Sequence, residues 1–147
     1  MSAPSATILR SAPLMTSPDA ATPTWARWTG RILTGIAVLF LAFDTAIKLV
    51  GAKAAVDGTV QVGFAPHLVL TLGLIELVCL VLYLVPRTAP LGAVLWTGYF
   101  GGAIAMHLRL GNPLFSHTLF PIYIAALLWA GLYLRDERVR ALLRPAR

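Results

Sequence analysis

The chain has 147 residues, of which 58% are hydrophobic and 12% are charged, and its formal net charge at pH 7 is +6. Soluble domains carry about twice that charged fraction, and a soluble interior of this size could not bury so many aliphatic side chains, so part of the surface must face lipid. The basic residues gather near the ends of the chain, without a stripe or interleaved aromatics, which argues against nucleic-acid binding. The single cysteine, Cys79, excludes an internal disulfide and a Cys-x-x-Cys relay.

Residues 1–24 are rich in Ser, Ala, Pro and Thr and show no usable period, which predicts a disordered N-terminal tail. Four apolar segments follow at about 31–50, 67–85, 89–107 and 119–135, and each is close to the length of about 20 residues that a bilayer requires. The short turn "PRTAP" makes the second and third segments an antiparallel hairpin. The sequence therefore predicts an all-α fold, an antiparallel four-helix transmembrane bundle over 25–136, followed by a basic cytoplasmic tail at 137–147.

The distribution of basic residues predicts the orientation in the membrane. Nine arginines fall on one side of the predicted bundle: Arg10, Arg27, Arg31, Arg87, Arg135, Arg138, Arg140, Arg144 and Arg147. The other side carries only Lys48, Lys53 and Arg109. The positive-inside rule then predicts a multi-pass protein of the inner (plasma) membrane with both termini in the cytoplasm.

Two acids and a lysine interrupt the apolar segments. Asp44 and Lys48 are four residues apart, in the acid-first order that favours an intrahelical ion pair, although Asp44 could instead face the bundle interior and bind a ligand. Glu76 lies nine residues beyond His67, about 13 Å into a hydrocarbon core about 30 Å thick, so it must be paired or protonated. Either Glu76 fixes helix packing through a hydrogen bond to another helix, or it belongs to a ligand or proton site that also includes Tyr83 of the same helical stripe.

The third apolar segment contains "GYFGGAIAMHLRLGNP". Gly98 and Gly102 form a small-xxx-small pair that predicts close helix packing. His107 and Arg109 follow at the predicted outer end, where Arg109 could bind an anion. The three histidines of the chain show no metal-binding spacing, so no metal site is expected.

The order of these features resembles the DoxX-like family of small bacterial membrane proteins. The matching region covers about 30–136, and the resemblance is carried by an acid in the second helix, the "PRT" turn, a double glycine followed by His-x-Arg, and "LFP" leading into the last helix. The resemblance implies a four-helix integral membrane protein. Namesake members are linked to quinone-dependent sulfur oxidation and to membrane redox complexes, and no catalytic residue set can be carried over.

Three functional hypotheses stay open. The first is a ligand-binding or accessory subunit of a quinone-linked redox system, with a candidate ligand or proton site made of Glu76, Asp44, His107, Arg109 and Tyr83. No flavin or nicotinamide fingerprint is present, so quinone is the one cofactor considered. The alternatives are a small proton-coupled transporter of an apolar solute and a non-catalytic membrane scaffold. The expected partners are the lipid bilayer and either a second copy or a redox subunit, and whether the protein is an enzyme is left open.

Overall fold

The computed structural model describes residues 23–143, so most of the predicted N-terminal tail and the last four residues lie outside the described part. No β-strand occurs within 23–143, which confirms the all-α prediction. The elements are α1 (Thr24–Leu49), α2 (Lys53–Gln61), α3 (Leu68–Leu84), α4 (Ala89–Arg109), the short π-helix η1 (Leu114–Thr118), α5 (Phe120–Arg135) and α6 (Glu137–Leu143).

The four predicted apolar helices correspond to α1, α3, α4 and α5, and the largest difference is at the start of α1. This helix begins at Thr24 rather than near Arg31, because Pro23 precedes it and the intervening residues contain no proline. Three short helices occupy segments predicted as loops or tail. The helix α2 was missed because "KAAVDGTVQ" has little apolar character, and only Ala55 and Thr59 of it are buried.

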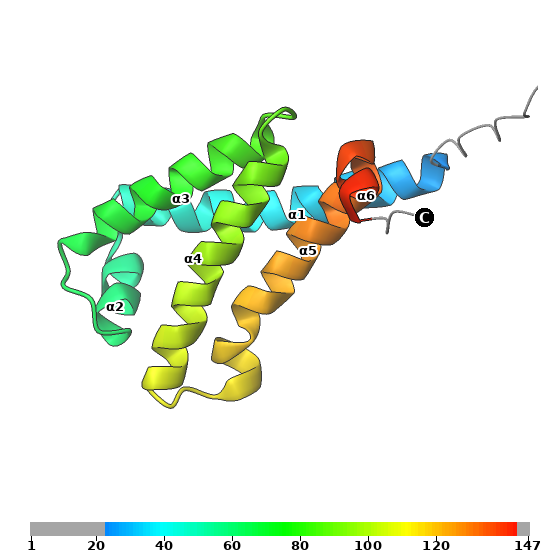
Figure 1. The fold of residues 1–147 in the computed structure, drawn as a ribbon. Coiled ribbons are helices and arrows are strands. Elements are labelled where there is room, and N and C mark those ends of the chain that lie inside the picture. Colours follow the sequence, from blue (N-terminus) through cyan, green and yellow to red (C-terminus); the bar gives the residue numbers. More distant parts are fainter. Residues whose placement is uncertain (1–22, 144–147) are drawn as a thin grey trace, which may run out of the picture.

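The helices are arranged as a bundle that is closed at one end and splayed at the other. Figure 1 shows α1 and α3 side by side, with α4 returning from the end of α3 and α5 running antiparallel to α4. At the closed end α5 packs along the first half of α1. Toward η1, α4 and α5 diverge from α1, and α2 lies beside the opening.

Glycines set the close approaches at the closed end. A Cβ added at Gly131 of α5 would lie 2.9 Å from the backbone nitrogen of Thr34 and 3.1 Å from the carbonyl oxygen of Gly30, so α1 and α5 pack backbone to backbone. The predicted pair Gly98 and Gly102 behaves differently, because an added Cβ at either position meets nothing within 4 Å. Within the described chain, small residues therefore mediate the α1–α5 contact, and this pair on α4 is exposed.

The outer surface of the bundle is apolar, as a lipid-facing surface requires. Large hydrophobic side chains on it include Leu39, Phe43 and Val78, which are 73%, 66% and 56% exposed. Of the described segments, Thr24–Leu49, Ala89–Arg109 and Leu114–Arg135 are long and apolar enough to cross a membrane, and α3 is apolar but shorter at 17 residues. The chain is therefore a helical membrane protein in contact with the bilayer.

Candidate functional site

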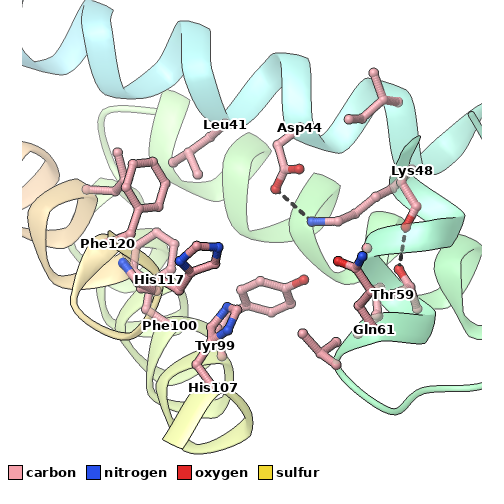
Figure 2. A pocket seen from close by; sticks show the side chains of 18 of the residues that line it. Leu41, Asp44, Lys48, Thr59, Gln61, Tyr99, Phe100, His107, His117 and Phe120 are labelled. Carbon is pink, nitrogen blue, oxygen red and sulfur yellow. Dashed lines mark hydrogen bonds and ion pairs between the residues drawn. The ribbon is translucent and has the colours of Figure 1, made fainter. Parts of the chain in front are cut away.

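The splayed end of the bundle contains an open cavity of about 760 Å³, lined by α1, α2, α4, η1, the start of α5 and one residue of α3. Figure 2 shows its polar residues projecting toward a common space beneath α1. Much of the wall is apolar, and its larger hydrophobic members are Phe40, Leu41, Leu72, Trp96, Phe100, Phe120 and Ile124. The volume and the mixed lining fall in the range found for pockets that bind small organic molecules in other proteins.

Lys48 connects two carboxylates at one wall of this cavity. Its Nζ lies 2.6 Å from Oδ2 of Asp44 on the preceding turn of α1, and it also forms an ion pair with Oε1 of Glu76 on α3. The Asp44 side chain is 31% exposed, Lys48 15% and Glu76 0%, so the group runs from the cavity into the protein interior. Asp44 and Lys48 line the cavity, and the ion pair between Lys48 and Glu76 connects Glu76 to it. We call these three residues the acid–lysine–acid group.

The close approach of α3 to α1 makes this ion pair possible. A Cβ added at Gly73 would lie 3.0 Å from Cβ of Lys48, so a larger residue there would push the two helices apart. Gly73 is one turn before Glu76 on the same face of α3, and both residues are buried. The glycine therefore positions the acid against the lysine.

The charges of the acid–lysine–acid group do not balance, and one of its oxygen atoms lacks a hydrogen bond. When both acids are ionised it has two negative charges and one positive charge. Oε2 of Glu76 is buried and forms no hydrogen bond of good geometry with a described residue, although Tyr99 on α4 comes close enough to interact with the carboxylate. A buried carboxylate oxygen without a donor is unfavourable, so a proton or a further donor completes the group.

An aromatic wall on α4 faces the acid–lysine–acid group. The ring centroid of Tyr99 lies 5.8 Å from Nζ of Lys48, and Figure 2 shows the Tyr99 hydroxyl on the lysine side of the cavity. Trp96 contacts Tyr99 edge to face, with centroids 5.6 Å apart, and stacks on Phe100 at 5.2 Å. These rings form an apolar wall that ends at the Tyr99 hydroxyl, beside the charged amine of Lys48.

Two histidines line the cavity near η1. The ring centroids of His107 and His117 are 6.0 Å apart. The amide Nδ2 of Asn112 donates to Nδ1 of His107 at 2.8 Å, so the neutral His107 ring carries its proton on Nε2. No cluster of three or more His, Cys, Asp or Glu residues suited to a metal ion was found between residues 23 and 143.

Three of the five residues of the predicted site lie at or next to the cavity, and two lie elsewhere. Asp44 and His107 line the cavity, and Glu76 adjoins it through Lys48. Arg109 does not line it: its Nη2 lies 2.7 Å from where a Cβ of Gly63 would be, against the loop after α2. Tyr83 is also elsewhere, because it is fully buried and donates its hydroxyl to the carbonyl oxygen of Leu128 at 2.9 Å.

Sequence reasoning missed the α4 wall of the cavity. Trp96, Tyr99, Phe100, Ala103 and His107 recur at helical spacing along α4 and all line the cavity. This period was readable in the sequence, but in a membrane helix that is apolar all round it does not distinguish the interior face from the lipid face.

The fold and the site define a class: a small helical membrane protein with an aromatic-walled cavity beside a buried acid–lysine–acid group. A family model described as the DoxX-like family matches residues 32–131, a range that contains every residue lining the cavity. The chain belongs to the DoxX-like family, which confirms the resemblance seen in its sequence. No curated protein and no solved structure matched the chain.

Proposed function

We propose that this DoxX-like membrane protein binds a quinone-class ligand in the cavity and acts as the ligand-binding or accessory subunit of a quinone-linked redox system. The observation that carries the proposal is the juxtaposition of an aromatic wall with proton-exchanging groups. A quinone ring is flat and apolar and has oxygen atoms at opposite ends. The cavity offers the aromatic side chains of its wall for the ring, Lys48 and Tyr99 for one oxygen, and His107 for the other.

The polar groups suit both redox forms of such a ligand. The oxidised oxygens accept hydrogen bonds, which the Lys48 ammonium, the Tyr99 hydroxyl and the His107 Nε2–H can donate. Reduction to the hydroquinone adds two electrons and two protons, and one of the new hydroxyls can donate to Asp44, the carboxylate that lines the cavity. Because the sequence carries no flavin or nicotinamide fingerprint, the electrons would come from a redox partner subunit.

The proposed location is the inner (plasma) membrane, with the closed end of the bundle toward the cytoplasm. The support is the charge distribution: Arg27, Arg31, Arg87 and Arg135 lie at the closed end, where α1 begins and α5 ends, whereas Lys53 and Arg109 lie at the splayed end. With this orientation the cavity is in the outer half of the bilayer.

The binding proposal predicts a specific effect of Tyr99→Phe. Calorimetric titration of the purified protein with a soluble short-chain benzoquinone should show one binding site. Tyr99→Phe should bind about three- to tenfold more weakly, because one hydrogen bond to the ligand is lost while the ring remains. Tyr133→Phe is the matched control, since Tyr133 is on the outer surface of α5 and does not line the cavity. Absence of binding, or equal weakening in both variants, would contradict the proposal.

A second candidate function is proton-coupled transport, and the unpartnered Oε2 of Glu76 favours it. A buried acid beside a solute cavity can couple protonation to solute binding. Vesicles with an imposed pH gradient should then accumulate a fluorescent lipophilic amine, and Glu76→Gln should abolish this flux while the protein stays folded. Flux that is unchanged in Glu76→Gln would remove the transport hypothesis.

A further inference from the structure

A second, smaller hollow of about 220 Å³ lies at the closed end of the bundle, away from the ligand cavity. Its lining comes from three segments: Arg31 on α1, Pro86 and Ala89 around the α3–α4 turn, and Arg135 and Asp136 at the end of α5. Two guanidinium groups therefore border one small space, and we call it the arginine pocket.

The Arg135 side chain is held in place by an aromatic ring, but two of its nitrogen atoms have no hydrogen-bond acceptor. Its guanidinium carbon lies 5.3 Å from the ring centroid of Tyr83, and Tyr83 is fixed by its hydrogen bond to Leu128. The Nε and Nη2 atoms of Arg135 are buried and have no acceptor among residues 23–143. These two nitrogens form one edge of the guanidinium, the edge that binds two oxygens of a carboxylate or phosphate side by side. Buried donors of this kind require a partner.

The charges around the pocket favour an anion. Arg31 stacks near Trp28, with its guanidinium carbon 5.4 Å from the ring centroid, and forms no ion pair with another described residue. Asp136 is the one acid in the lining, and its Oδ1 accepts a hydrogen bond from the backbone nitrogen of Arg138 at 2.9 Å, at the start of α6. Two arginines and one aspartate leave the pocket with a net positive charge.

The depth of the pocket matches the headgroup level of a bilayer. Trp28 on α1 is 59% exposed and Tyr133 on α5 is 40% exposed, and amphipathic aromatic side chains of this kind settle at the membrane–water interface. Arg31 and Arg135 are within three residues of these two aromatics along their helices. The phosphate groups of lipids lie at the same level, and basic pockets between membrane helices bind anionic headgroups.

We propose that the arginine pocket binds a phosphate group between Arg135 and Arg31, the two cations that line it. The phosphate can be the phosphodiester of an anionic phospholipid or free inorganic phosphate. This site is independent of the ligand cavity and of the quinone proposal.

The test compares matched arginine variants of the full chain after removal of native lipid. Native mass spectrometry would measure retention of phosphatidylglycerol relative to phosphatidylcholine, and a second arm would measure binding of inorganic phosphate. Arg135→Gln and Arg31→Gln should each weaken phosphate binding about tenfold, because each removes a charged hydrogen-bonding group. Arg138→Gln makes the same charge change on an exposed residue outside the lining and should retain binding.

The outcomes separate the alternatives. Retention of phosphatidylglycerol that is lost in the two pocket variants supports the site with a lipid as its source, and binding of inorganic phosphate alone supports it with free phosphate. Equal loss in Arg138→Gln would show general surface attraction and overturn the proposal, as would the absence of binding in both arms. If Arg135→Gln does not fold, the Arg31→Gln variant still tests the proposal, because Arg31 is exposed and its replacement should not disturb folding.

Discussion

Lys48→Met is expected to lower the free energy of unfolding by about 3–5 kcal/mol, because it removes the cation that two acids share. Glu76 is fully buried, so its carboxylate cannot recover this interaction from solvent. Asp44 is partly exposed and should contribute less to the loss. Reversible unfolding in mixed micelles, followed by circular dichroism, measures the change.

Two comparisons make this prediction specific. Lys53→Met removes a lysine from the exposed first turn of α2 and should change stability by less than about 0.5 kcal/mol. The double variant Lys48→Met/Glu76→Gln should lose less than the sum of its single losses, since each change removes the other's need for a partner. Additive losses, or a Lys48→Met variant as stable as Lys53→Met, would show that the acid–lysine–acid group does not hold α1 to α3.

Gly92→Ala is expected to destabilise the protein by about 1–3 kcal/mol or more, through backbone overlap in the α3–α4 hairpin. A Cβ at Gly92 would lie 2.6 Å from the Cα of Tyr83 and 2.8 Å from the carbonyl carbon of Leu82. Those atoms belong to the backbone and cannot rotate away, so the hairpin must open. The same unfolding measurement would detect the loss.

Gly98→Ala is the matched control on the same helix. No atom lies within 4 Å of the added Cβ, so the substitution should be neutral or should stabilise α4 by up to about 1 kcal/mol through helix propensity. If Gly98→Ala is as destabilising as Gly92→Ala, then Gly98 contacts a group outside the described residues. A second copy of the protein would be the first partner to test for that contact.

The bundle could be predicted from the sequence because long apolar segments in a membrane have few structural options. The segment boundaries of α3, α4 and α5 agree with the structure to within two residues. The short helices could not be predicted in this way. The helix α2 has a weak apolar period, and η1 follows Pro113 in a segment of mixed composition.

The site was less predictable, because an apolar helix gives no signal of which face turns inward. Depth and spacing did predict that Glu76 would be buried and that Asp44 could pair with Lys48. They could not show that Lys48 also reaches Glu76, since that contact depends on how closely α1 approaches α3. The separation of Tyr83 and Arg109 from the cavity likewise depends on helix crossing rather than on order along the chain.

Cysteine protection would show whether the cavity beside the acid–lysine–acid group takes the quinone-class ligand that we propose. In a Cys79→Ser background, Ala103→Cys places a thiol on the cavity wall and Gly98→Cys places one on the outer surface of α4. We predict that a short-chain benzoquinone with every ring position substituted, which cannot add a thiol, blocks labelling of Ala103→Cys by N-ethylmaleimide and leaves labelling of Gly98→Cys unchanged. Equal labelling of Ala103→Cys with and without the quinone would contradict the claim.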